Sequence, residues 1–240
     1  MMVAGKQVVG RPMLLLEAIK ALDLKALYLP DQKRILLDKE QPEAKWRWNE
    51  AHEITHSLLP WHNSFMQGDN AITLTPTCHD CIEAEANFGA GRLLFMQDKF
   101  KQRVLDSAPS IKTVQELKKL FSNSLTSTLW RYVEQNDRIM VGVVSAHPHY
   151  RPDDFDPAAP CRYFISSSGF AKKFGNVTET DVFNCIDSYC SWKKKGPLGE
   201  EEVVLTDCVG VQHVFHFETF SNQYDALTLG YYKEVKTEIF

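Results

Sequence analysis

The sequence predicts an α+β fold with a helical first part and a mostly β second part. Amphipathic runs dominate up to residue 135, and a short strand-turn-strand pattern lies near their start. Beyond residue 136, β-branched and aromatic runs alternate with turn-rich segments. With 240 residues, of which 44% are hydrophobic, the chain can bury a core of its own. We therefore expect two domains, 1–135 and 136–240.

The first predicted elements are short. Residues 14–22 form a helix candidate. Residues 26–29 and 34–37 are apolar runs on either side of a turn that opens with Pro30 and Asp31. This pattern predicts an antiparallel hairpin directly before the next helix, which contains the main motif.

The next helix carries the most informative string of the chain. It is predicted to begin at Pro42 and to run without glycine or a further proline until Pro60 ends it. Residues 52–56 within it read His-Glu-Ile-Thr-His. Two histidines four residues apart lie on one face of a helix and can reach a single Zn²⁺, while Glu53 can hold a water molecule beside the metal. The plainer alternative is an ordinary histidine pair, either exposed to solvent or buried with its ring nitrogens hydrogen-bonded.

A second helix, predicted at residues 81–96, offers the third ligand. Alanines and long side chains dominate it, and its two glycines weaken it without breaking it. Hydrolytic zinc sites usually take three protein ligands. Glu83 and Asn87 share one face, so Glu83 can complete the site and Asn87 can hydrogen-bond the outer nitrogen of a ligand histidine. Glu85 points about 200° away from Glu83, so we do not expect it at the metal.

The HExxH string and the Glu-Ala-Glu-Ala-Asn string that begins at Glu83 resemble the ImmA/IrrE family of zinc metallopeptidases. The resemblance covers residues 20–135 and implies a zincin-like helical core with a small antiparallel sheet. It also implies that His52, His56 and Glu83 bind zinc and that Glu53 is the catalytic general base.

The same resemblance implies that the amphipathic helices predicted at 113–121 and 125–133 form a helix-turn-helix-like element. The simpler alternative is that these helices close the domain by packing. Two residues depart from the family pattern: Thr55 stands where members commonly have Gly, and Gly89 where they commonly have Phe. These departures concern the packing of the two ligand helices rather than the ligands.

The second part of the chain offers no clear site. Its predicted strands are residues 138–144, 162–165, 202–205, 211–218 and 226–232. His213 and His216 are three residues apart in one strand and so face opposite sides, and His147 and His149 lie in a turn. We interpret all four as ordinary surface or core histidines.

Cys78 and Cys81 form a Cys-x-x-Cys pair, a spacing that serves both structural zinc sites and thiol redox chemistry. No second pair of matching spacing follows, and the other four cysteines are scattered. We expect loop thiols before the helix, and structural zinc remains the alternative.

Charge and hydropathy exclude two classes of partner. The formal net charge of -4 provides no basic field, so direct nucleic acid binding is not expected. No apolar run approaches the roughly 18 residues of a membrane span, and the N-terminus lacks a signal core. Six cysteines without a secretory signal indicate reduced thiols, and we expect a cytoplasmic protein.

The sequence therefore predicts a zinc-dependent endopeptidase. By the family resemblance, its substrate is a separate transcriptional repressor, cleaved in response to stress or a mobile-element signal. The alternative is a non-catalytic regulatory module that binds other proteins and in which zinc only braces the fold. A closed structural site needs a fourth protein ligand, which His62 or Cys78 could supply.

Overall fold

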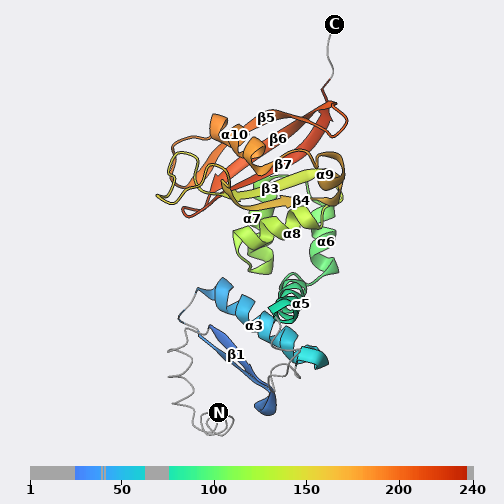
Figure 1. Cartoon of the computed structure of the whole chain (residues 1–240), viewed down its shortest axis with the longest axis vertical. Helices are drawn as coiled ribbons and strands as arrows, with labels where there is room; N and C mark the ends of the chain where they lie inside the picture. Colours follow the sequence, from blue (N-terminus) through green and yellow to red (C-terminus); the bar gives the residue numbers. More distant parts are fainter. Residues whose placement is uncertain (1–24, 39, 41, 63–75, 237–240) are drawn as a thin grey trace. The chain divides into compact units, whose positions relative to one another are not determined.

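The computed structural model describes residues 25–38, 40, 42–62 and 76–236 (Figure 1). The fold is α+β, as the sequence predicted. The chain divides into two compact units, Met1–Gln97 and Asp98–Phe240, which are described separately below. The helix expected at 14–22 lies outside the described residues.

The first unit contains a two-stranded antiparallel sheet and two long helices. Its elements are β1 (Ala26–Leu29), the 3-10 turn η1 (Pro30–Gln32), β2 (Arg34–Leu37), α3 (Glu43–Leu58) and α5 (Pro76–Leu94). Lys33 closes the hairpin in the left-handed region with a φ of 49°, and its backbone N–H donates to the carbonyl of Pro30. Helix α3 packs against α5 and against both strands. The hairpin predicted from the sequence is confirmed.

Both helices predicted in the first unit are present, with starts that differ from the expected ones. Helix α3 begins at Glu43, so Pro42 is the residue just before the helix rather than its first residue as expected, and it makes no side-chain capping hydrogen bond. Helix α5 starts at Pro76, earlier than the expected residue 81, and continues through Gly89 and Gly91. It ends before Met96, which has a positive φ.

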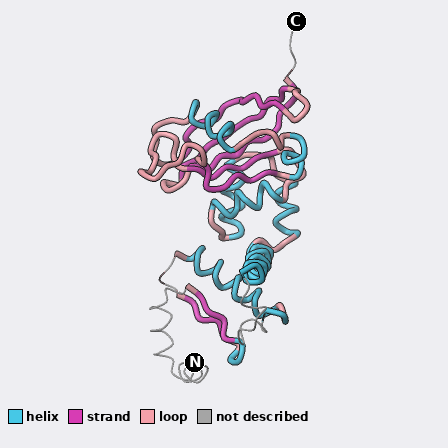
Figure 2. The backbone as a smooth tube through the Cα atoms, viewed as in Figure 1, coloured by secondary structure: helices cyan, strands magenta, loops and turns pink. Residues whose placement is uncertain are grey.

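The second unit is built around a five-stranded antiparallel sheet (Figure 2). Its strands are β3 (Met140–Ser145), β4 (Cys161–Ser166), β5 (Gly196–Thr206), β6 (Gln212–Ser221) and β7 (Ala226–Val235). Their order across the sheet is β4-β3-β7-β6-β5. All five strands expected from the β-branched and aromatic runs are present.

Helices cover the sheet of this unit on both faces. They are α6 (Asp98–Leu105), α7 (Ile111–Phe121), α8 (Leu125–Glu134), α9 (Ser168–Lys173) and α10 (Glu179–Tyr189). The sequence did not predict α9 or α10, although Thr178 and Asp181 form a capping box that marks the start of α10. Strands outweigh helices within residues 136–240, so this part of the chain is mostly β, as expected, with α9 and α10 added to it.

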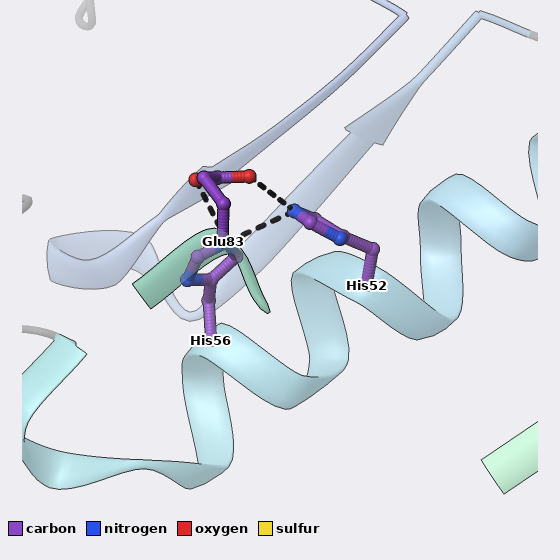
Figure 3. Close-up of side chains that lie close together, drawn as sticks. All are labelled: His52, His56 and Glu83. Atoms are coloured by element: carbon purple, nitrogen blue, oxygen red, sulfur yellow. Dashed lines mark hydrogen bonds and ion pairs between the residues drawn. The ribbon is translucent and has the colours of Figure 1, made fainter. Parts of the chain in front are cut away.

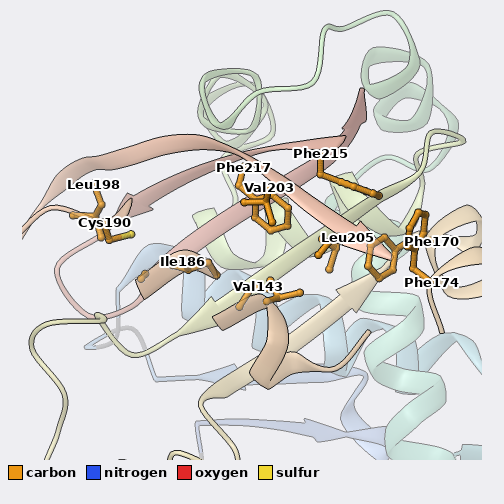
Figure 4. Packing of buried hydrophobic residues seen from close by; sticks show 13 residues of the cluster. Val143, Phe170, Phe174, Ile186, Cys190, Leu198, Val203, Leu205, Phe215 and Phe217 are labelled. Atoms are coloured by element: carbon orange, nitrogen blue, oxygen red, sulfur yellow. The ribbon is translucent and has the colours of Figure 1, made fainter. Parts of the chain in front are cut away.

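The main core of the second unit lies between the sheet and the pair α9–α10 (Figure 4). Val141 and Val143 of β3 point into it, and Phe170 and Ile186 come from the two helices. Gly142, between those valines, faces the opposite side because successive strand residues alternate. There a Cβ on Gly142 would lie 2.9 Å from Val133 of α8, so helix and sheet approach closely.

Helices α7 and α8 are thus part of the sheet unit. The carboxylate of Glu218 on β6 accepts a hydrogen bond at 2.8 Å from the backbone N–H of Ile111, the first residue of α7. Trp130 of α8 meets Tyr163 of β4 edge-on. The units divide at Gln97, whereas the expected boundary after residue 135 falls inside the second unit, because apolar burial joins these helices to the sheet.

Candidate metal centre

Two helices bring the predicted ligands together (Figure 3). His52 and His56 project from one face of α3, and Glu83 reaches them from α5. The Nε2 atoms of the histidines are 3.0 Å apart, and they lie 3.1 Å and 3.6 Å from the two carboxylate oxygens of Glu83. Among the residues that the structure describes, this is the group whose ligand atoms, all within 4.8 Å of one another, could hold a metal ion.

The spacing of these atoms fits a tetrahedral ion. Ligands about 2.0–2.1 Å from a tetrahedral Zn²⁺ lie about 3.3–3.4 Å from one another. The three observed separations bracket that value. The side chain of His56 is 6% exposed and that of Glu83 is 40% exposed, so the group opens to solvent on the Glu83 side. An ion held here would keep one side accessible to water.

Asn87 holds the outer nitrogen of the first histidine. It lies one turn after Glu83 on α5, and its Oδ1 atom is 3.1 Å from Nδ1 of His52. An amide oxygen can only accept, so His52 carries its proton on Nδ1 and leaves Nε2 free to bind a metal.

The outer nitrogen of the second histidine meets another histidine. Nδ1 of His56 is 2.8 Å from Nδ1 of His62, whose side chain is fully buried. His62 therefore lies on the side of His56 away from Nε2, not among the ligand atoms. From the sequence, His62 was considered only as a possible fourth metal ligand. Its contact with His56 could not be predicted from helical spacing, because His62 lies beyond the end of α3.

Glu85 contacts the other ring nitrogen of His62. Its Oε2 atom is 3.0 Å from Nε2 of His62 and accepts a hydrogen bond of 2.8 Å from the indole N–H of Trp61. These two hydrogen bonds, His62 first, lower the pKa of the Glu85 carboxyl. Glu85 does not join the ligand group, yet it is connected to it through His62.

Glu53 is fixed by the first strand. Its Oε2 atom accepts a hydrogen bond of 2.9 Å from the backbone N–H of Tyr28 on β1. Burial raises the pKa of the Glu53 carboxyl, while the charge of His52 and the Tyr28 hydrogen bond partly offset that rise. The strand thereby orients a half-buried carboxylate next to the ligand histidines.

The histidines of the second unit are engaged elsewhere. Nε2 of His147 and Nε2 of His149 lie 2.9 Å and 2.7 Å from backbone carbonyl oxygens. His213 is buried and its Nε2 lies 2.9 Å from Asp207, while His216 on the other face is only partly buried. The geometry agrees with the interpretation of these residues as structural histidines.

The described cysteines are all free thiols, and Cys81 is exposed. Cys78 and Cys81 both lie within α5, so the expectation of loop thiols before the helix is wrong. The side chain of Cys78 lies outside the described residues, and the structural zinc alternative stays a prediction. No helix in the described part of the chain combines the length and the apolar character needed to cross a bilayer.

An apolar groove of about 590 Å³ flanks the ligand helices. Leu58 and Phe88 are more than half exposed along it. Its lining comprises Thr55, Leu58, Leu59, Trp61, Ala84, Glu85, Phe88, Gly89, Arg92, Leu93 and Gln97. Glu85 thus borders both the groove and the hydrogen bonds behind the metal ligands.

Comparison with known proteins gives little to set beside this geometry. No protein-family model matches the chain, and no curated protein sequence matches it significantly. A solved structure of a Mycobacterium tuberculosis transcriptional regulator is similar over 87% of this chain, with 13% identity and a TM-score of 0.48. The chain covers 62% of the length of that structure.

Proposed function

We propose that this protein is a zinc-dependent endopeptidase. The observation that supports it most is the three-residue group of His52, His56 and Glu83, which presents its ligand atoms to a side that is open to solvent. Hydrolytic zinc sites have three protein ligands and an open position, whereas structural sites are closed by four. His62, the described residue that could have closed the shell, is bonded to the back of His56 instead.

Glu53, Tyr28 and Asn87 would each have a separate role in hydrolysis. A bound zinc ion would polarise a water molecule and the scissile carbonyl. Glu53 is the general base: it accepts the proton of the attacking water and passes it to the leaving amine. Tyr28 keeps one oxygen of Glu53 engaged, which leaves the other oxygen for the water. Asn87 keeps the ring of His52 in the orientation that binding requires.

The substrate class follows from the resemblance to the ImmA/IrrE family. On that basis we propose a separate transcriptional repressor as the substrate, cleaved in the cytoplasm in response to stress or a mobile-element signal. The free thiols of the described cysteines suit a reducing compartment. The second unit carries no metal group among its described residues, so we place the chemistry in the first unit.

The test is proteolysis by the whole chain. Purified protein is loaded with Zn²⁺ and incubated with a peptide library and with candidate repressors, and new termini are identified by mass spectrometry. Cleavage by the parent and none by Glu53→Gln supports the proposal. If neither cuts while both hold zinc, the site is structural and the regulatory-module alternative gains support.

A further inference from the structure

A fully buried histidine links a ligand of the candidate metal centre to a carboxylate on the other helix. His62 lies between His56 and Glu85, with separations of 2.8 Å and 3.0 Å at its two nitrogens. Its ring centroid is 4.9 Å from that of His56. The backbone N–H of His62 donates to the carbonyl of Leu59, so the chain folds back at the end of α3 and brings the ring to this place.

The three side chains have one consistent set of proton positions when a metal is bound. If Nε2 of His56 binds a metal, the imidazole proton of His56 must lie on its Nδ1 atom. That N–H then points at Nδ1 of His62. That atom must then accept, which leaves the proton of His62 on Nε2, where it donates to Glu85. Each donor therefore points away from the metal and toward the carboxylate.

The two ligand histidines are supported in different ways. His52 has a direct amide partner in Asn87, which lies on α5. The outer nitrogen of His56 is linked to α5 through His62 and Glu85, and Trp61 also donates to Glu85 and holds it in place. Loss of His62 would remove the 2.8 Å contact at the outer nitrogen of a nearly buried ligand.

We propose that His62 and Glu85 are positioning residues that fix the ring orientation and the proton of His56 for metal binding. The inference rests on the proposed zinc site. It assigns to the second glutamate of the Glu-Ala-Glu-Ala-Asn string a role that its helical position, facing away from Glu83, does not reveal. Loss of a partner that orients a metal ligand typically lowers metal affinity about 10–100-fold.

The test measures Zn²⁺ affinity by competition with a chelator and records the Co²⁺ absorption spectrum of the substituted protein. His62→Phe keeps the ring volume and removes both hydrogen bonds, so it should weaken Zn²⁺ binding about 10–100-fold and alter the Co²⁺ bands. His62→Asn keeps an acceptor near the Nδ1 position and should restore much of the affinity. The control is Asp80→Asn. Asp80 is an exposed residue of α5, the helix that carries Glu85, and its substitution should change neither the affinity nor the spectrum.

Glu85→Gln tests the far end of the chain of hydrogen bonds. A neutral amide accepts more weakly than a carboxylate, so we expect a smaller loss of affinity than for His62→Phe. In the His62→Phe background Glu85→Gln should have no further effect, because the connecting ring is gone. Equal losses in both backgrounds would show that Glu85 acts independently of His62 and would overturn the linkage.

A comparison with His52→Ala separates failure of this inference from failure of the zinc site. If His52→Ala loses Zn²⁺ but a folded His62→Phe binds it within twofold of the parent, the positioning role is wrong and the site stands. If His52→Ala also keeps its Zn²⁺, the site itself is wrong. Should His62→Phe fail to fold, His62→Asn and Glu85→Gln decide by the same measurements, and parental affinity and spectra in both would reject the role.

Discussion

Gly89 of α5 lies directly against Thr55 of α3. A Cβ atom on Gly89 would be 2.3 Å from Cγ2 and 2.6 Å from Oγ1 of Thr55, closer than real side chains come. Thr55 sits between the two ligand histidines, and Gly89 follows Asn87 by two residues. This contact therefore sets the separation of the two helices at the point where they share the metal ligands.

This contact joins the two residues that depart from the ImmA/IrrE pattern. Where members of that family commonly have Gly on the first helix and Phe on the second, this chain has Thr55 and Gly89. Here the glycine is on α5, and it faces Thr55 of α3.

Gly89→Ala should destabilise the first unit by about 1–3 kcal/mol, because the new methyl group overpacks the interface. It should also weaken Zn²⁺ binding by moving Glu83 away from the histidines. Thr55→Gly removes the obstructing side chain, so the double variant should be less destabilised than the sum of the single changes. Calorimetric melting of the four proteins measures the coupling, and strictly additive losses would contradict the close contact.

The residues of α5 should differ in their effect on zinc. Glu83→Ala removes a ligand and should lower Zn²⁺ affinity most, whereas Asn87→Ala removes a hydrogen-bond partner of His52 and should cost about 10–100-fold. Titration against a competing chelator ranks the two variants. A larger loss for Asn87→Ala than for Glu83→Ala would show that the ligand assignment is wrong.

Glu53→Gln should keep Zn²⁺ and lose hydrolysis. The amide has nearly the shape of the carboxylate and can still accept from the backbone of Tyr28, but it cannot take a proton from water. We expect peptide cleavage to fall at least about 100-fold, the lower end of the usual contribution of such a group. Parallel metal analysis is the control, and residual cleavage above about one-hundredth of the parent rate would remove Glu53 from the role of base.

The stability of the second unit should depend on pH through Asp207. Burial alone would raise the pKa of its carboxyl, but hydrogen bonds from His213 and from two backbone N–H groups hold it below the ordinary 3.8. A lowered carboxyl pKa in the folded state stabilises the protein above pH 3.8, and this contribution disappears as the pH falls through the folded value.

Asp207→Asn should therefore melt well below the parent at pH 7 and approach the parent as the pH falls below 3.8. Asp153→Asn, an exposed loop carboxylate, is the control and should track the parent throughout. A melting difference between Asp207→Asn and the parent that does not change with pH would contradict the assignment.

Local patterns were enough to predict much of this structure. The hairpin follows from Pro30 and the apolar runs beside it, and the His-Glu-x-x-His helix follows from its spacing and from Pro60. The contact of Glu83 with both histidines could be anticipated because a helical face fixes which residues of α5 point together.

Other features depend on contacts that no local pattern encodes. The place of α7 and α8 against the sheet depends on Gly142 and on Glu218, which is far from Ile111 in the sequence. The link from His56 through His62 to Glu85 depends on how the chain turns after α3. In contrast, the capping box at the start of α10 was a readable local signal that the sequence-based prediction missed.

X-ray absorption at the zinc edge of the loaded protein tests the central claim most directly, because it reports the atoms bound to the metal. A shell of two imidazole nitrogens at about 2.0–2.1 Å together with oxygen ligands, and no sulfur, is the predicted result. This is the shell that His52, His56 and Glu83 would form with one water molecule. A sulfur at about 2.3 Å or a third imidazole would mean that Cys78 or His62 closes the site, and this result would contradict an endopeptidase.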